Sequence, residues 1–317
     1  MDIIVGMGIT QEDSKYEVTY EVINTGINKE NTDAKKSYTV TGGGKTIASA
    51  IKSTTSKLNK KPYFEHMRIV LINSSLDILS LSDYFIRNNN ISSNFYLVLT
   101  DDPKSLLEYT SQDKQINSKE VYNILNNINY PSLRNYFDFQ VNDIISKKKD
   151  ITIPYISLED KLAFKSYGLY HQNKFITLLS TDNLNLHDYY LHNKNIILKN
   201  NNNSLNIYKT NYKIKLTNEV NITLNIEATI DSLDTEIDLR KESSFKQLEI
   251  EFREVLTKEM TSYLKYLQSL NTDILGINNL NYLKTKNYSE DYFSQSNINL
   301  KINLKINRPG LTIRKVS

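Results

Sequence analysis

The chain has 317 residues, no cysteine and a formal net charge of +3. The lack of cysteine excludes disulfides and thiolate metal sites within these residues, and the weak, well-mixed charge argues against a nucleic-acid-binding protein. No apolar run approaches the roughly 18 residues that can span a bilayer, and no signal peptide is apparent. The length therefore predicts two or three folded domains without a membrane-spanning helix.

The first third of the chain predicts a mixed sheet with helices packed on it. Residues 3–9 and 16–24 are strand candidates, and in the second strand apolar and polar residues alternate, which predicts one buried face and one wet face. The pair Asp102-Pro103 is typical of a helix start, because carboxylates favour a helix N-terminus and proline fits its first turn. The other elements predicted here are buried strands at 67–72 and 95–100 and a helix at 76–87.

The stretch 41–73 contains the strongest local signals. Its three glycines, Gly42-Gly43-Gly44, predict a turn that ends the preceding strand. A helix of about four turns is expected after Lys45-Thr46, because apolar positions recur at helical spacing until Pro62. These positions are Ile47, Ile51, Thr54 and Leu58.

The segment GGGKT at 42–46 allows a nucleotide-binding alternative. Strand, glycine turn, Lys-Thr and helix is the order in which a phosphate-binding loop is built. The motif is incomplete, because its first glycine should stand where Thr39 is and no apolar strand ending in aspartate follows. We therefore favour a plain glycine turn with Lys45 in solvent, and nucleotide binding remains the alternative.

Four short motifs are spread along nearly the whole chain. Gly-Lys-Thr-Ile at 44–47 opens a helix and is followed by PYFEHMRIVLI at 62–72. The others are Gly6-Met7-Gly8-Ile9, Asp273-Ile274-Leu275-Gly276 and Arg308-Pro309-Gly310-Leu311. In this order the motifs resemble the Ger(x)C family, the C subunits of spore germinant receptors, with Thr10 standing where the family has aspartate.

The resemblance implies a non-enzymatic lipoprotein on the outer surface of the spore inner membrane. In the family a signal peptide ends in a lipobox whose cysteine carries the lipid, so we expect that cysteine upstream of this sequence. The implied partners are the germinant receptor A and B subunits in the membrane, and the implied role is nutrient-triggered germination. A free-standing ligand-binding lipoprotein is a further alternative, and it requires a deep pocket with convergent polar groups.

The sequence predicts α+β architecture in three units, residues 1–112, 113–203 and 204–317, arranged as an elongated body. In the last unit, three segments alternate strictly between apolar and polar residues and predict an antiparallel sheet with one apolar face. A long helix at 242–270 keeps one apolar stripe and is the expected cover of that face. The alternating segments are 212–216, 222–230 and 298–306.

The middle unit predicts helices and a hairpin. Ser118 and Ser132 are candidate caps of two helices, the second of which ends at the lysines of 147–149. A hairpin is expected around 171–174, followed by a short helix near 184–191.

No catalytic, cofactor-binding or metal-ligating residue is predicted, no cofactor is implied, and we expect no enzyme. His66 is expected to be a hydrogen-bonded structural residue, and His187 and His192 are expected at the surface because no third ligand accompanies them. The acidic pairs lie near turns or helix starts, so capping explains them better than acid–base catalysis, which needs facing carboxylates. These pairs are Asp101-Asp102, Glu159-Asp160 and Glu290-Asp291.

Overall fold

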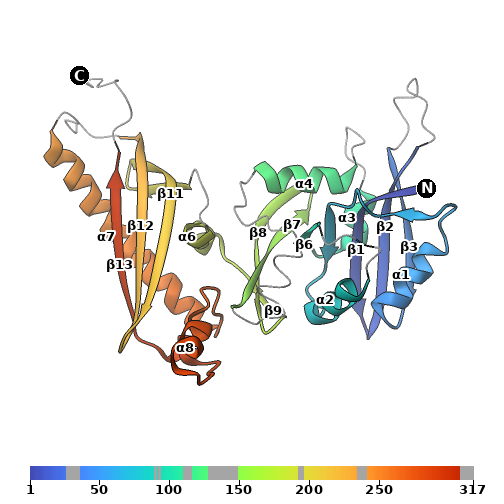
Figure 1. Cartoon of the computed structure of the whole chain (residues 1–317). Coiled ribbons are helices and arrows are strands. Elements are labelled where there is room, and N and C mark those ends of the chain that lie inside the picture. Colours follow the sequence, from blue (N-terminus) through green and yellow to red (C-terminus); the bar gives the residue numbers. More distant parts are fainter. Residues whose placement is uncertain are drawn as a thin grey trace. The chain divides into compact units, whose positions relative to one another are not determined.

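The structure is a computed structural model that describes residues 1–25, 36–88, 91, 94–109, 116–127, 149–191, 196–233 and 241–307. The described residues up to Leu179 form one compact unit, and those from Ser180 onward form a second (Figure 1). We call them the N-terminal unit and the C-terminal unit. The sequence predicted three units, whereas the described residues cluster into these two. The predicted helix that begins at Ser132, its end at 147–149 and the motif at 308–311 lie wholly or largely outside the described residues.

A nine-stranded sheet forms the N-terminal unit, in the order β3-β2-β1-β5-β6-β7-β8-β9, with β4 paired to β1. Strands β1, β5, β6 and β7 pair in parallel, and the outer strands on both sides pair antiparallel. Strand β7 joins β6 through Leu99 and Tyr155, so the boundary predicted at 112 falls inside one sheet. The strands are β1 (Asp2–Glu12), β2 (Lys15–Ile23), β3 (Ser37–Gly44), β4 (Pro62–Tyr63), β5 (Ile69–Ile72), β6 (Tyr96–Leu99), β7 (Ile151–Leu158), β8 (Leu162–His171) and β9 (Lys174–Leu178).

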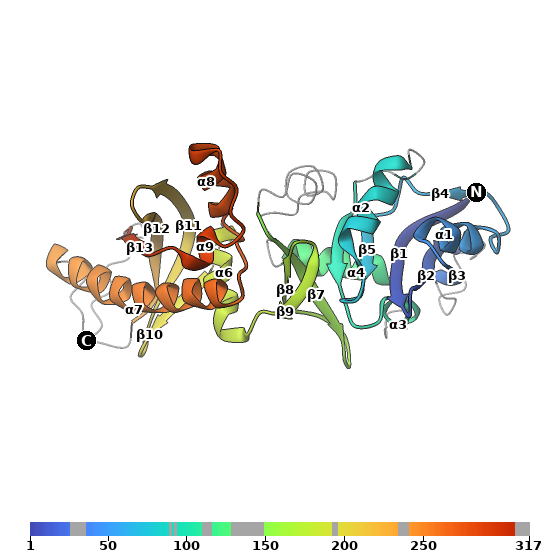
Figure 2. The same ribbon diagram turned by 90° about the horizontal axis from the view of Figure 1, so that it is seen from below.

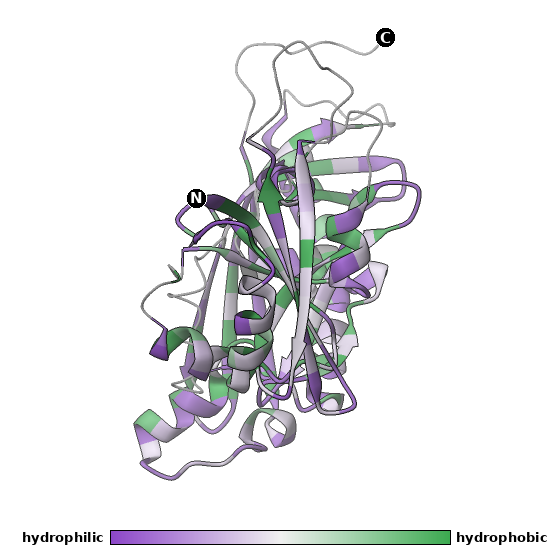
Figure 3. Cartoon of the chain, turned by 90° about the vertical axis from the view of Figure 1, so that its right-hand side faces the viewer, coloured by the Kyte–Doolittle hydropathy of each residue, from purple (hydrophilic) through white to green (hydrophobic). Residues whose placement is uncertain are grey.

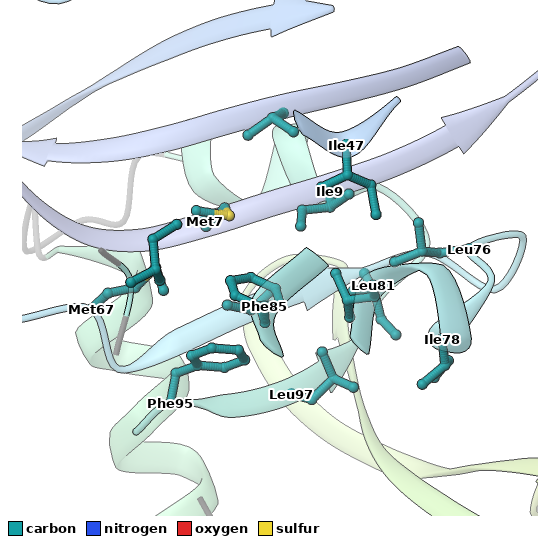
Figure 4. Close-up of a cluster of buried hydrophobic side chains, with 14 of the residues drawn as sticks. Met7, Ile9, Ile47, Met67, Leu76, Ile78, Leu81, Phe85, Phe95 and Leu97 are labelled. Atoms are coloured by element: carbon teal, nitrogen blue, oxygen red, sulfur yellow. The ribbon is translucent and has the colours of Figure 1, made fainter. Parts of the chain in front are cut away.

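Helices cover this sheet on both faces. Helices α1 (Ile47–Thr55) and α2 (Ile78–Arg87) contribute to one apolar cluster, which also contains Val70 and Ile72 of β5. Helices α3 (Pro103–Glu108) and α4 (Asn117–Asn127) contribute to another, with Ile69 and Leu71. Figure 4 shows the first cluster, in which side chains of β1, such as Met7 and Ile9, lie with Phe85 and Phe95. The fully buried β5 strand confirms the interpretation of that apolar run.

The prediction that the three glycines end a strand was wrong. Gly42, Gly43 and Gly44 continue β3 and pair with Val18, Glu17 and Tyr16 of β2. A Cβ at Gly42 would stand 2.4 Å from the backbone nitrogen of Thr54 in α1, so glycine here allows close approach of helix to strand. Helix α1 is also shorter than the predicted four turns: it runs from Ile47 to Thr55.

The prediction of a wet face on β2 holds for the exposed Glu17 but was wrong for Thr19 and Glu21. Thr19 is 2% exposed and Glu21 is fully buried, although both alternate with apolar residues. The Glu21 carboxylate accepts hydrogen bonds from the backbone nitrogens of Asn117 (2.8 Å) and Ser118 (2.9 Å), at the start of α4, and from Ser37 Oγ (2.8 Å). Glu21 therefore caps α4, which was the role predicted for Ser118, because a carboxylate satisfies free amide groups at a helix N-terminus.

The C-terminal unit has a four-stranded sheet in the order β10-β11-β12-β13. Its last pair, β12 and β13, is parallel, which corrects the predicted antiparallel sheet. Parallel neighbours need a crossover, and helix α7 lies in that connection (Figure 2). The elements are α6 (Thr181–Leu191), β10 (Ile196–Asn200), β11 (Asn203–Leu216), β12 (Val220–Ser232), α7 (Glu242–Ser269), α8 (Ile277–Thr285), α9 (Tyr292–Gln295) and β13 (Ile298–Ile306).

Large side chains join α7 to the inner face of this sheet. Phe252, Leu256 and Met260 of α7 are fully buried, as are Ile222 and Leu224 of β12. Figure 3, in which the N-terminal unit faces the viewer, shows hydrophobic and hydrophilic segments interspersed along the ribbons. The long helix and the alternating strands confirm the sequence prediction for this region.

Candidate functional site

The start of helix α1 does not form a phosphate-binding loop. Thr46 Oγ1 accepts a hydrogen bond from the backbone nitrogen of Ser49 (3.1 Å), and Ser49 Oγ accepts one from the backbone nitrogen of Thr46 (2.9 Å). This capping box occupies helix-start amides that a phosphate would need. The glycines before it run as extended strand and do not wrap around a ligand. Lys45 is exposed, as the sequence predicted.

An open groove of about 1190 Å³ lies between the start of α1 and the outer side of α2. We call it the α1–α2 groove. Its lining includes Lys45 and Thr46 from the α1 end and Leu79, Tyr84, Ile86 and Arg87 from α2. It is the candidate functional site because it combines a large opening with exposed apolar side chains.

The polar side chains around the α1–α2 groove have local partners. Asp77 caps α2 by accepting hydrogen bonds from the backbone nitrogens of Leu79 (3.1 Å) and Ser80 (3.3 Å). Arg87 Nε donates to Asp83 Oδ1 at 2.8 Å. These polar groups therefore support α2 itself more than they converge on a ligand.

Tyr84 is the half-buried aromatic of the groove. Burial raises the pKa of its phenol, while the hydrogen bond that Asn88 Nδ2 donates to its oxygen (2.6 Å) acts in the opposite direction. The phenol stays neutral near pH 7, because the ordinary pKa of tyrosine is about 10.

The α1–α2 groove exposes apolar side chains of helix α2. Leu79 is 49% exposed and Ile86 is 50% exposed, and they stand seven positions apart on α2. Seven residues are close to two helical turns, so the two side chains share one side of the helix. The opposite side of α2 is buried through Ile78, Leu81 and Phe85.

The glycine motif near the N-terminus serves helix packing. A Cβ on Gly6 would stand 2.6 Å from Ser118 Cβ in α4, and one on Gly8 would stand 3.0 Å from Pro103 Cβ in α3. Side chains two apart in a strand face the same side. Gly6 and Gly8 thus let α3 and α4 approach the same face of β1.

The Asp-Ile-Leu-Gly motif caps helix α8. Asp273 is 3% exposed, and its carboxylate accepts hydrogen bonds from the backbone nitrogens of Ile277 (3.0 Å) and Asn278 (2.7 Å). Gly276 has φ 74°, in the left-handed region that glycine adopts without strain. The Asn278 side chain then donates to Glu290 O and accepts from the backbone nitrogen of Phe293, both at 2.8 Å. The motif therefore fixes the segment that returns the chain to β13.

The histidines lie apart from one another in the sequence and have different surroundings. His66 is exposed and its ring stands edge-on to Tyr63. His187 is fully buried, and its Nδ1 shares a hydrogen bond with Tyr263 Oη at 2.8 Å, so the prediction of a surface residue was wrong. A partner 76 positions away gives no local signal in the sequence. His171 pairs with Asp150 at 2.9 Å, and His192 is outside the described residues.

The acidic pairs have structural partners. Asp102 caps α3, as predicted, by accepting from the backbone nitrogens of Lys104 and Ser105. Asp101 instead accepts a hydrogen bond from Tyr155 Oη (2.6 Å), and burial together with this bond raises the pKa of that phenol. Glu159 pairs with Lys165 at 2.9 Å. At the third pair, Asp291 has no side-chain cap bond and accepts from Asn271.

The His, Asp and Glu side chains of the described residues form no group of three that could hold a metal ion. No helix in the described ranges combines the length and the apolar character needed to cross a bilayer.

Two family models match the chain in succession. Residues 1–158 match the spore germination protein N-terminal domain, and residues 171–310 match the spore germination B3/GerAC-like C-terminal domain. The crystal structure of the GerBC protein is similar, with a TM-score of 0.56 and 14% identity, covering 95% of this chain and 96% of that chain. This likeness confirms the α+β fold class. No curated protein sequence matches the chain.

Proposed function

The chain belongs to the GerAC-like family of spore germination proteins, and we propose that it is the non-enzymatic C subunit of a spore germinant receptor. The observation that carries the proposal is the succession of both family domains along almost the whole chain. The overall likeness to GerBC supports a shared architecture. The acidic pairs and the buried histidine have structural partners, in a helix cap, an ion pair and side-chain hydrogen bonds.

The proposed receptor is held at the spore inner membrane. We propose that a lipid on a cysteine upstream of this sequence anchors the subunit on the outer surface and that the subunit assembles with the membrane-embedded A and B subunits. A single acyl chain gives only marginal membrane binding, so stable residence requires additional contacts. Partner subunits would supply such contacts.

We propose that the α1–α2 groove receives apolar side chains of a partner subunit. Leu79 and Ile86 are half exposed on a helix whose other side is buried in the core, so the core fixes which side of α2 is open to a partner. Interfaces are centred on apolar anchors that fill such openings. A free-standing ligand-binding protein would instead need convergent polar groups, and those near the groove are bonded locally.

The test of receptor function is deletion of the gene in the spore-forming source, followed by germination assays on nutrient germinants. Loss of the response to at least one germinant, restored by the wild-type gene, is expected. Normal germination of the deletion strain on every germinant, in the absence of a redundant paralogue, would contradict the proposal.

The test of the groove compares two variants in co-purification with the A and B subunits. The double change Leu79→Asp with Ile86→Asp should reduce recovery of the partners at least tenfold, because charge would enter an apolar contact. Ile250→Asp on α7 is the matched control, since Ile250 is also an exposed helical isoleucine, at 39%. Equal recovery with both variants would remove the groove from the interface while leaving the receptor assignment intact.

A further inference from the structure

The outer face of the C-terminal sheet carries an ordered array of lysines. Across β11, β12 and β13 the register aligns residues in rows, and the alternate residues of each strand face the apolar core under α7. Four successive rows on the outer face read Lys209-Glu227-Lys305, Asn211-Asn225-Asn303, Lys213-Thr223-Lys301 and Lys215-Asn221-Asn299. We call this surface the lysine face.

The lysine face carries an excess of positive charge that few acidic residues offset. It holds five exposed lysines and one acid, Glu227, a net charge of +4, whereas the whole chain has a net charge of +3. Glu227 pairs with Lys209 at 2.6 Å. For Lys213 and Lys301 the described part of the chain contains no ion-pair partner. The modest overall charge therefore conceals a local concentration of positive charge.

The lysines of this face lie close enough together for their electrostatic potentials to add. From Lys209 to Lys215 the strand advances about 20 Å, and β11 and β13 lie about 10 Å apart, given the usual spacings of a sheet. The lysines of β11 and β13, on either side of β12, are thus separated by about one Debye length at physiological salt, so their potentials overlap. A planar anionic surface would meet several of them at once.

The side chains between the lysines keep the face polar. Asn299 Nδ2 donates to Asn221 Oδ1 (3.1 Å), and Asn303 Nδ2 donates to Asn225 Oδ1 (2.8 Å). These amide bonds link β12 to β13 across the outer surface. The four rows contain lysine, asparagine, one threonine and one glutamate, and so offer neither an apolar anchor nor an aromatic platform.

We propose that the lysine face docks on an anionic lipid bilayer. Charge complementarity requires an anionic occupant, and lysine, a flexible point charge, suits diffuse attraction to a headgroup layer. A protein partner would favour apolar or aromatic anchors, and a single-stranded nucleic acid would favour stacking residues; the four rows have neither. The inference goes beyond receptor membership, because it concerns how this unit meets a membrane surface and needs no partner subunit.

The test is co-sedimentation of the purified chain with vesicles. Vesicles of equal parts phosphatidylcholine and phosphatidylglycerol should bind the chain at low salt, and vesicles of phosphatidylcholine alone should not. Each lysine near an anionic surface contributes about fivefold in affinity. The double change Lys213→Gln with Lys301→Gln should therefore weaken binding about 25-fold. Added salt should weaken binding of the wild type more than that of the variant.

The matched control is the double change Lys258→Gln with Lys265→Gln. Both lysines are exposed on α7, which covers the other side of the sheet, and the change in net charge is the same. Binding should change less than twofold, and the melting temperatures of both variants should match that of the wild type. An equal loss with both variants would show that net charge alone drives binding and would overturn the proposal.

Two further results would also overturn it. One is failure of the wild type to bind anionic vesicles at low salt. The other is a preference for an acidic protein or single-stranded DNA over the vesicles, lost in the Lys213/Lys301 variant, which would assign the face to a different polyanion. Because the assay uses the isolated chain, its result is independent of the germination phenotype that tests the receptor assignment.

Discussion

The two sheets of this protein hold their helices in different ways. In the N-terminal unit, strands β1 and β3 place glycines under the helices, so that backbone nearly meets backbone. In the C-terminal unit, the strands contain no glycine, and large side chains from β12 and β13 meet those of α7. Close approach leaves little room for change, whereas side-chain packing depends on filled volume. The two units should therefore fail under opposite kinds of substitution.

Removing volume should harm the C-terminal unit most. Phe252 of α7 is fully buried, and Phe252→Ala should destabilise this unit by about 4 kcal/mol, because a cavity replaces the ring. Urea unfolding measures the loss, and hydrogen exchange shows whether the weakened amides lie beyond Ser180. A loss below about 1 kcal/mol would show that α7 is not held by its side chains.

Adding volume should harm the N-terminal unit. Gly42→Ala should destabilise it by about 3 kcal/mol, because the new methyl group would meet backbone atoms of α1. Gly43 provides the control, since its Cβ would approach nothing closer than 3.6 Å. Gly43→Ala should leave the free energy of unfolding within about 0.5 kcal/mol of the wild type. Similar effects at the two positions would refute the close-approach interpretation.

The two units also differ in how a buried carboxylate caps a helix. Glu21 caps α4 from a strand 96 positions away and also holds Ser37, whereas Asp273 caps α8 from four positions away. Glu21→Ala should cost about 3 kcal/mol, because it leaves buried amides without acceptors and releases α4 from the sheet. Asp273→Ala should cost about 2 kcal/mol, in the range of a lost helix cap. Urea unfolding compares them, and a larger loss at Asp273 would reverse the order of local and remote capping.

Lys45 should give the smallest effect. Its side chain is exposed and the capping box beside it is made by Thr46 and Ser49, so Lys45→Ala should change stability by less than about 0.5 kcal/mol. ATP and GTP should not raise the melting temperature of the wild type. A nucleotide-dependent rise that Lys45→Ala removes would restore the phosphate-loop alternative, because a ligand of the native state must stabilise it.

Local patterns in the sequence predicted much of the fold. The alternation in β12 and β13 and the apolar stripe of α7 each lie within one element, so their period reveals the buried face. The Asp273 motif could be recognised as a family motif, although its capping role needed the structure. The parallel pairing of β13 could not be predicted from alternation, which is the same for either strand direction.

Remote partners account for what the sequence did not show. Glu21 has the position of a solvent-facing residue in an alternating strand, and only the arrival of α4 buries it. The glycines of β3 were interpreted as a turn, because their helix contact lies outside the local pattern. The α1–α2 groove and the lysine face are likewise assembled from elements that are separate in sequence, so composition averaged over the chain conceals both.

The parallel pairing of β12 with β13 also governs how the C-terminal unit acquires its structure. Strands β11 and β12 are joined by the short turn at 217–219, and a hairpin of this kind closes within microseconds. Asn221 and Asn299, partners in the β12–β13 pair, are 78 positions apart, so this contact carries a much larger loss of chain entropy. Formation of α7 shortens that connection by winding it into a rod. The helix that covers the sheet therefore also lowers the entropy cost of completing it.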